Sequence, residues 1–244
     1  MRILRLDEVD STNTYVERHT AELRHGDVVV TDRQTAGRGQ RGNSWESEPG
    51  ENITFTMLLK PKIEATQQFV LSCAVALAVC DTLKEMCGVN CLVKWPNDIY
   101  AGDDRKICGI LISHSLQGKR ISHTIAGVGI NINQQRFLSD APNPASVWQL
   151  TGRRHDCETI LHSLADKIDK FTDRLSDPSF RTYIKEEYMR RLWRGDGATY
   201  PFLETSTGER FDASVVDIEP LGHLLLRDTK GKLRRYAFKE VAWI

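Results

Sequence analysis

The sequence of 244 residues lacks the features of several large protein classes. Its longest apolar stretch, Phe69 to Cys80, is far shorter than the ~20 residues that a membrane-spanning helix needs. Lysine plus arginine equals aspartate plus glutamate at 33 each, so no net charge favours nucleic acid or a membrane surface. The charged N-terminal segment contains no apolar run of signal-peptide length. We therefore expect a soluble cytoplasmic protein in which any anion site is built locally.

Cysteine is sparse, with six residues and no Cys-x-x-Cys pair. Cys73, Cys80 and Cys87 recur at a heptad spacing, which places them on one face of a helix. In a reducing cytosol such cysteines behave as small buried hydrophobes more often than as disulfides or metal ligands. We expect them in the core.

Residues 1–194 contain predicted strands and helices in the combination that indicates a mixed α/β domain. Strands are expected at 2–9, 27–33 and 52–59, and an all-strand passage at 91–133 contains a hairpin around 101–104. Helices are expected at 12–23, 66–86, 156–175 and 178–192. A chain of this length can bury a sizeable core and leaves room for one further small domain.

The remaining residues, 195–244, differ in their predicted secondary structure. They contain four or five short strands that are separated by turns at Thr207–Gly208, Leu221–Gly222 and Lys230–Gly231. Short strands in so small a segment predict an SH3-like β-barrel. The expected organisation is a mixed-sheet domain at 1–194 followed by this small β domain at 195–244.

The sharpest functional signal is a glycine-rich loop with the sequence QTAGRGQRGNSW. Its notable residues are Gln34, Gly37, Arg38, Gly39, Gln40, Arg41, Gly42 and Trp45. Glycines expose backbone N–H groups and allow a loop to wrap an anion closely, and arginine adds charge-assisted contacts to carboxylate or phosphate. A surface loop with solvated charges is the alternative, but the density of these features favours an anion-binding loop.

A second signal is the segment KWPND, which ends a strand. A proline just past a strand ends the ladder and fixes a turn, which would aim Lys94, Asn97 and Asp98 into one cleft. Lys106 re-enters the cleft from the next strand. Two ammonium groups beside a basic loop suit a site that holds two anions together. Taken singly, each lysine is more often a solvated surface residue.

Two weaker signals remain open between structure and function. Ser11, Thr12 and Asn13 precede a helix, so they either cap it or line a site. Asn131 and Asn133 lie in the strand-like run GVGININ and either form a turn or bond a purine edge. This run is not a dinucleotide-binding fingerprint, and the sequence contains no GxxxxGK[ST] phosphate loop.

Together these motifs resemble the biotin–protein ligase family. The resemblance runs along the whole chain through DSTN, QTAGRGQRGNSW, KWPND, DRK with CGIL, GVGININ and the final β domain. It implies a catalytic domain related to that of class II tRNA synthetases and an SH3-like C-terminal domain. It also implies an enzyme that uses ATP and Mg²⁺ to convert biotin to biotinyl-5'-AMP, and then transfers biotin to a lysine of a biotin carboxyl carrier protein.

The family's binding residues carry over to matching positions of this sequence. Ser11, Thr12, Asn13 and Gln34 match the residues that face the biotin ring and its ureido group. Arg38, Gly39 and Gln40 match the loop that folds over the activated carboxylate. Lys106 matches the lysine on the reacting carboxyl oxygen, and the Gly109 backbone would lie close to biotin.

The adenylate side carries over in the same way. Lys94 matches the phosphate-contacting lysine, Trp45 would cover the adenine, and Asn131 would lie near the base. Arg41 and Asn97 are assigned to the adenylate as well. The predicted catalytic group is Arg38, Lys94, Lys106 and Asp98, and Asp98 would hold either a cationic group or the metal.

Two departures from the family stand out. Gln40 replaces an arginine of several members, and the core begins at residue 1, without the winged-helix DNA-binding domain of the repressor members. We therefore expect no DNA binding, while the role of Gln40 and formation of a homodimer stay open. The rival functions are a lipoate or octanoyl transferase, which KWPND disfavours, and a non-catalytic biotin sensor or DNA-bound repressor, which the neutral net charge disfavours.

Overall fold

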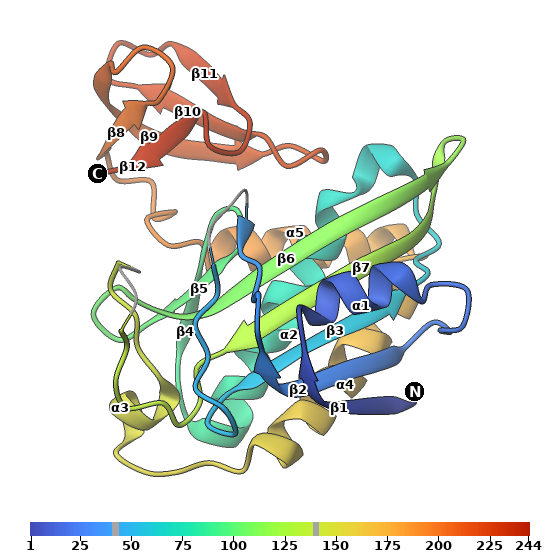
Figure 1. Ribbon diagram of the computed structural model, residues 1–244. Coiled ribbons are helices and arrows are strands. Elements are labelled where there is room, and N and C mark those ends of the chain that lie inside the picture. The colour runs from blue at the N-terminus through green and yellow to red at the C-terminus, as the bar shows by residue number, and fades with distance from the viewer. Residues whose placement is uncertain (41–43, 139–141) are drawn as a thin grey trace.

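The computed structural model describes residues 1–40, 44–138 and 142–244. These residues form two β-sheets, and helices pack on the larger one (Figure 1). The larger sheet has the strand order β1-β2-β3-β7-β6-β5-β4. Its strands are β1 (Ile3–Val9), β2 (Asp27–Gln34), β3 (Ile53–Leu59), β4 (Cys91–Lys94), β5 (Asp98–Ala101), β6 (Arg105–Gln117) and β7 (Arg120–Ile130). β1 and β2 run parallel, whereas the other neighbouring strands of this sheet pair antiparallel. The predicted mixed sheet is therefore present.

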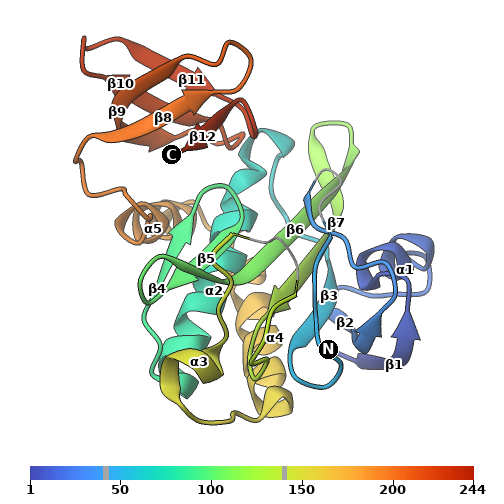
Figure 2. The same cartoon turned by 60° about the vertical axis from the view of Figure 1, so that its left-hand side comes forward.

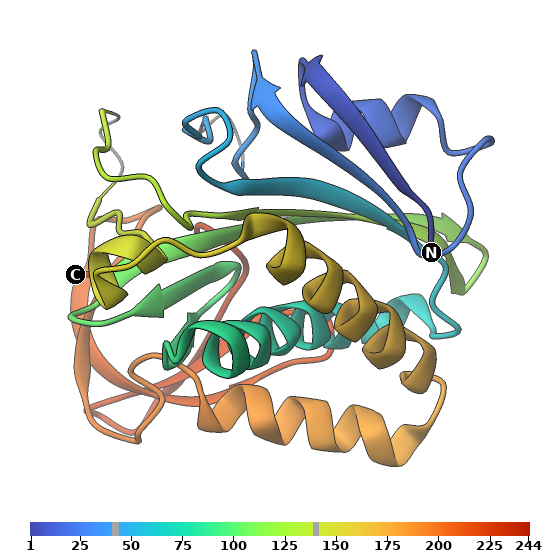
Figure 3. The same ribbon diagram turned by 90° about the horizontal axis from the view of Figure 1, so that it is seen from below.

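Helices cover the two faces of this sheet unequally, as Figure 3 shows from below. On one face lie α2 (Phe69–Cys87), α4 (Cys157–Arg174) and α5 (Pro178–Arg190), whereas α1 (Thr12–Arg18) lies on the other. The short helix α3 (Val147–Thr151) lies near the end of β4 and β5 (Figure 1). No helix in the described ranges is long and apolar enough to cross a membrane.

The central helix α2 is buried along most of its length because small and apolar residues occupy all of its faces. A 3₁₀ turn at Ala65–Gln67 precedes it, so the α-helix begins three residues later than predicted, at Phe69. The helix ends at Gly88, whose φ of 73° lies in the left-handed region that glycine adopts without steric cost. Gly88 therefore terminates α2 directly after Cys87.

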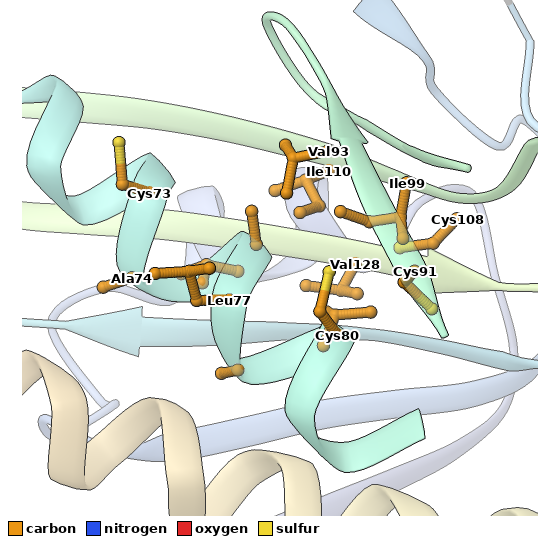
Figure 4. Packing of buried hydrophobic residues seen from close by; sticks show 14 of the residues in the cluster. Cys73, Ala74, Leu77, Cys80, Cys91, Val93, Ile99, Cys108, Ile110 and Val128 are labelled. Carbon is orange, nitrogen blue, oxygen red and sulfur yellow. The ribbon is translucent and has the colours of Figure 1, made fainter. Parts of the chain in front are cut away.

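The cysteines of α2 belong to the hydrophobic core, as predicted. Cys73, Cys80 and Cys87 are buried free thiols. Figure 4 shows Cys80 and Leu77 of α2 beside Val128 of β7. Burial raises the pKa of the Cys73 thiol far above its ordinary range, so this side chain stays a neutral, small hydrophobe.

Two further predicted boundaries are wrong. Helix α1 ends at Arg18 and not near Leu23, because His19 leaves the helical conformation and its ring Nδ1 lies 2.8 Å from the carbonyl oxygen of Tyr15. Strand β7 ends at Ile130, so the two asparagines that follow lie outside the strand. Beyond the end of β7 the main chain bonds to a side chain: Ile132 N donates a hydrogen bond to Asn52 Oδ1 at 2.9 Å.

Helix α3 was not predicted at all. Its N-cap, Ser146, forms a capping box in which its side chain accepts from Gln149 N and the Gln149 side chain accepts from Ser146 N. This local signal, a serine followed three residues later by glutamine, is present in the sequence. The helix was missed because it has only five residues.

The smaller sheet is antiparallel, with the order β11-β10-β9-β8-β12. Its strands are β8 (Tyr200–Glu204), β9 (Arg210–Ile218), β10 (Leu224–Asp228), β11 (Leu233–Tyr236) and β12 (Val241–Trp243). All five short strands were expected. No strand pairing joins β11 to β12 within the described residues, so the barrel is not closed by main-chain bonds.

The smaller sheet lies at one end of the larger one (Figure 2). Trp95 Nε1 donates to the carbonyl oxygen of Gly222 at 3.0 Å, and Phe69 N donates to that of Pro220 at 3.1 Å. One continuous hydrophobic cluster includes residues of both sheets, among them Phe202 of β8. The division into domains at residues 194 and 195 therefore stays a prediction.

Candidate active site

A large cavity of about 990 Å³ lies between the α1 face of the larger sheet, the glycine-rich loop and the smaller sheet. Each predicted site residue in the described part of the chain lines it: Ser11, Thr12, Asn13, Gln34, Arg38, Gly39, Gln40, Trp45, Lys94, Asn97, Asp98, Lys106, Gly109 and Asn131. Arg41 lies outside the described residues. The volume is at the upper end of the ~300–1,000 Å³ that is usual for ligand sites. A cavity of this volume has room for a ligand that consists of two joined parts.

The floor of this cavity is made of glycines on neighbouring strands. Gly109 of β6 lies directly opposite Gly129 of β7. The indole of Trp45 packs on this pair so closely that a Cβ on Gly129 would lie 2.5 Å from the ring, and one on Gly109 would lie 2.9 Å from it. The glycines are therefore needed because an aromatic ring approaches the backbone at both positions.

A polar cluster forms one end of the cavity. Thr12 N donates to Gln34 Oε1 at 2.9 Å, and Thr56 Oγ1 lies 2.8 Å from Thr12 Oγ1 and 2.6 Å from Asn13 Oδ1. Asn13 Nδ2 donates to the carbonyl oxygen of Leu111 at 3.2 Å. These side chains are tied to β2, β3 and β6, so the cluster is preorganised.

Ser11 decides between the two interpretations of the Ser-Thr-Asn run. It holds the N-cap position of α1, but its side chain makes no capping hydrogen bond. Ser11 is only 3% exposed and lines the cavity. Capping therefore does not explain this serine, and its role toward a ligand stays a prediction.

Two lysines form the cationic part of the cavity. Lys106 Nζ lies 2.7 Å from Asp98 Oδ1, at ion-pair distance but without a well-aligned hydrogen bond. Lys94 Nζ donates to the hydroxyl oxygen of Tyr100 at 2.7 Å. Burial lowers the pKa of Lys94, an effect that nearby Asp98 opposes and nearby Lys106 reinforces. Both lysines are half-buried and partnered, so neither is a solvated surface residue.

Aromatic rings connect Lys94 to the smaller sheet. The ring of Tyr100 lies 5.4 Å from that of Trp193, which lies 5.2 Å from that of Trp243 in β12. Lys94 Nζ also lies 5.2 Å from the centre of the Trp193 ring. The series ends in the core of the smaller sheet, where the rings of Trp243 and Phe202 are 4.6 Å apart.

These aromatic residues were missed by the sequence analysis. Tyr100 follows Asp98 by two positions in a strand, and such residues share one face of a sheet, so this signal was available. Trp193 and Trp243 gave no comparable signal, because only the tertiary structure brings them together.

The two asparagines after β7 have different roles. Asn133 joins two loops, because its Nδ2 donates to the carbonyl oxygen of His155 and its Oδ1 accepts from His155 N, each at 2.9 Å. Asn131 Nδ2 donates to the carbonyl oxygen of Ala145, but its buried Oδ1 has no hydrogen-bond partner among the described residues. The buried Nε1 of Trp45 also lacks one there. An unpaired acceptor and an unpaired donor therefore line the same cavity, and such buried groups are costly unless a ligand satisfies them.

The loop residues lie at the rim. Arg38 is exposed, and its Nη1 donates to Thr14 Oγ1 at 3.2 Å. Trp45 N donates to the carbonyl oxygen of Gly37 at 3.1 Å, and Arg38 pairs with Ser44 in an isolated antiparallel bridge. The loop thus doubles back over the cavity. Asn97 Nδ2, at the other wall, donates to the carbonyl oxygen of Ile110 at 3.1 Å.

Comparison with known families identifies this arrangement. The model of the biotin/lipoate A/B protein ligase family matches residues 6–131, which is more than half of the chain. This chain belongs to that family. The matched range includes both the glycine-rich loop and KWPND, so the residues that line the cavity floor and its cationic part are family positions.

Relatives within the family align with most of the length of this chain. The bifunctional ligase/repressor BirA of Bacillus subtilis is 37% identical over 222 residues, which cover 87% of this chain and 65% of that protein. Biotin–protein ligase 2 of Arabidopsis thaliana is 28% identical over 235 residues, covering 89% of this chain and 67% of that one. The chain therefore spans about two thirds of the length of these relatives.

A solved structure has the same fold. The biotin protein ligase of Aquifex aeolicus, in complex with biotin and ATP, superposes with a TM-score of 0.81 at 24% identity. The match covers 99% of this chain and 97% of that one. The predicted fold class, mixed α/β with a mixed sheet followed by a small antiparallel sheet, is confirmed.

Proposed function

We propose that this protein is an ATP-dependent biotin–protein ligase. It would form biotinyl-5'-AMP with release of pyrophosphate, and then transfer biotin to a lysine of a biotin carboxyl carrier protein in the cytoplasm. The observation that carries the proposal is one cavity with a neutral polar end at Thr12, Asn13 and Gln34 and a cationic part at Lys94 and Lys106. A relative at 37% identity is named a bifunctional ligase/repressor, and one at 28% identity is named a biotin–protein ligase. A structure of the same fold was solved in complex with biotin and ATP.

The neutral polar end suits the biotin ring. A ureido group carries two N–H donors and one carbonyl acceptor, and it has no charge. The hydroxyl and amide groups of Ser11, Thr12, Asn13 and Gln34 offer donors and acceptors without a formal charge. We assign this end, with the Gly109 backbone, to biotin.

The cationic part suits the reaction. Biotin's carboxylate must attack the α-phosphorus of ATP, and these two anions repel each other. Lys106 would hold the carboxylate, Lys94 the phosphates, and Arg38 the activated group from the rim, so that the reactants meet in a fixed geometry. The doubled-back loop with Gly39, Gln40 and Trp45 would shield the mixed anhydride from water.

The adenine would lie near Asn131, Asn97 and Trp45. The unpaired Oδ1 of Asn131 is an acceptor that suits the exocyclic amino group of adenine. The indole of Trp45, on its glycine floor, offers an aromatic face for the base. We assign Arg41, which lies outside the described residues, to this side as well.

Mg²⁺ fits this cavity as an ion that the nucleotide carries. The described residues contain no cluster of three histidine, cysteine or acidic side chains that would form a protein cage. Mg²⁺ commonly binds substrate phosphates and only one or two carboxylates, and Asp98 is a carboxylate beside the cationic part of the cavity. When bound, the ion would neutralise negative charge on the phosphates.

The test separates the two half-reactions. With ATP, Mg²⁺ and radiolabelled biotin but no acceptor, we expect pyrophosphate release and a retained adenylate. Addition of a carrier domain should then move the label to its lysine. Pyrophosphate that appears only with the carrier would contradict the two-step scheme. Labelling by lipoate or octanoate in preference to biotin would assign the chain to the other branch of its family, and retention of biotin with neither step would identify a sensor.

A further inference from the structure

A second, smaller cavity of about 260 Å³ adjoins the first. It lies between the beginning of α2, strand β6 and the turns of the smaller sheet. The two cavities share Gln40, Pro96, Asn97, Ile110 and Phe238. The smaller one therefore lies next to the larger one, beside the glycine-rich loop and KWPND.

The size of the second cavity suits a side chain and not a nucleotide. A water molecule occupies ~30 Å³ in the liquid, so the cavity holds about nine groups of that size. A lysine side chain beyond its Cα has five non-hydrogen atoms, whereas sites for whole ligands usually begin at ~300 Å³.

The chemistry of the walls is also distinctive. None of the described residues that line the second cavity is an aspartate, glutamate, lysine or arginine. His114, on its β6 wall, has its Nδ1 2.8 Å from Thr124 Oγ1, and burial lowers the pKa of this histidine to about 4. His114 is therefore neutral near pH 7. Aliphatic and aromatic side chains such as Phe69 and Ile112 form much of the remainder.

We propose that the second cavity admits the side chain of the acceptor lysine, whose amine reaches the acyl carbon of the adenylate past Gln40 and Asn97. The inference rests on the proposed function and adds the route of the second substrate. The adenylate would occupy the larger cavity beneath its loop, so the nucleophile needs a separate approach.

The transfer step balances without a further reagent. The amine nitrogen forms a bond to the acyl carbon, and the bond between that carbon and the phosphate oxygen breaks. AMP leaves with the electron pair, and the nitrogen gives up a proton to water. Only a neutral amine can attack, and a cavity that is lined by the imidazoles of His114 and His223 and by no carboxylate disfavours the ammonium form of a lysine whose ordinary pKa is about 10.4.

The smaller sheet acquires a role in this scheme. It roofs the second cavity with Leu221, Gly222 and Ala237. The hydrogen bond from Trp95 Nε1 to the carbonyl oxygen of Gly222 fixes that roof to the KWPND segment. The C-terminal residues would thus shape the acceptor route as well as the nucleotide cavity.

Ser72→Leu tests the proposal because it fills the second cavity alone. Ser72 is half-buried on α2 and lines the smaller cavity but not the larger one. Leucine has a higher helix propensity than serine, so the helix itself is not weakened. We expect adenylate formation without acceptor to stay within about twofold of the parent, while transfer to the carrier domain falls at least about tenfold (about 1.4 kcal/mol).

Three further variants complete the experiment. Ala237→Leu fills the same cavity from the opposite wall and should divide the two half-reactions in the same way; it decides the matter if Ser72→Leu does not fold. Ser72→Ala removes the hydroxyl without filling space and should behave as the parent. Ser163→Leu, half-buried on α4 and lining neither cavity, controls for the substitution itself.

The outcomes are distinct. Transfer at the parental rate in the filled variants would overturn the proposal, and so would an equal loss of adenylation and transfer, which would place the cavity on the nucleotide's path. A parent that forms no adenylate would overturn the proposed function itself, and the inference with it, before any variant is compared.

Discussion

The two faces of strands β3, β7 and β6 make a direct comparison. On the core face lie Phe55, Val128 and Ile110, which are mutual neighbours across the three strands and are almost fully buried against α2. The neighbouring residue on each of these strands points to the opposite face. These neighbours are Thr54, Gly129 and Gly109, which also lie side by side across the three strands. One face is made of bulky side chains, and the other is made of small ones.

The difference shows how one sheet serves as both core and binding site. Successive residues of a strand point to opposite faces, so bulky residues that fill the core alternate along each strand with small residues that leave the other face open. Bulky residues on the core face exclude water and stabilise the fold. The missing side chains on the other face create a cavity whose floor is backbone. Substitutions on the two faces should therefore separate stability from ligand binding.

The largest expected effect is on the core face. Ile130 is fully buried, so Ile130→Ala should lower the free energy of unfolding by about 2–5 kcal/mol through lost burial and a residual cavity. Urea unfolding measures this loss, and titration of the folded fraction should show parental affinity for biotin. A variant that loses affinity without losing stability would contradict the division between the faces.

The next effect concerns the cationic part of the cavity. Lys106→Ala should raise the biotin requirement and slow adenylation, because a charge-assisted contact is worth about 1.5–3 kcal/mol, or about ten- to a hundredfold. Lys94→Ala should weaken the binding of an ATP analogue by a similar factor. Calorimetric titration with biotin alone and then with the analogue distinguishes the two variants. If both turn over like the parent, the assignment of the cavity is wrong.

A smaller effect is expected at Gly127, which faces the polar end of the cavity. A Cβ at this position would lie 1.9 Å from Asn13 Oδ1, so Gly127→Ala should displace Asn13 from Thr56. Overpacking of this kind costs about 1–3 kcal/mol, and we expect much of it to appear as weaker biotin binding. Met57→Ala, at a fully buried core-face residue that does not line the cavity, is the control: it should lower the melting temperature while biotin affinity stays at the parental level.

The smallest effect should come from Tyr100→Phe. This change keeps the ring beside Trp193 but removes the hydroxyl oxygen that accepts from Lys94 Nζ. Loss of such a bond is worth about 0.5–1.5 kcal/mol. We expect a several-fold weaker affinity for the ATP analogue and no change for biotin. An equal weakening of both ligands would show that Tyr100 supports the cavity as a whole.

Much of the candidate site was accessible from local patterns. The glycine-rich loop and the strand-ending proline of KWPND predicted which segments approach a ligand, and the structure brings these segments to one cavity. The assignment of single residues to biotin or adenylate came from family resemblance and stays a prediction. Asn131 and Asn133 were indistinguishable in the sequence, because their difference lies in the loop around His155, which is distant along the chain.

The sequence by itself determined the order of the strands and of every helix except α3, the buried cysteine face of α2 and the family, because each depends on residue spacing within a short segment. Only the tertiary structure decided that Trp45 rests on Gly109 and Gly129, that Trp193 and Trp243 connect Lys94 to the smaller sheet, and that a second cavity opens beside Gln40. These features join residues from strands and loops far apart along the chain. Their contacts depend on sheet register and on how the smaller sheet packs against the larger one, and no local pattern encodes either.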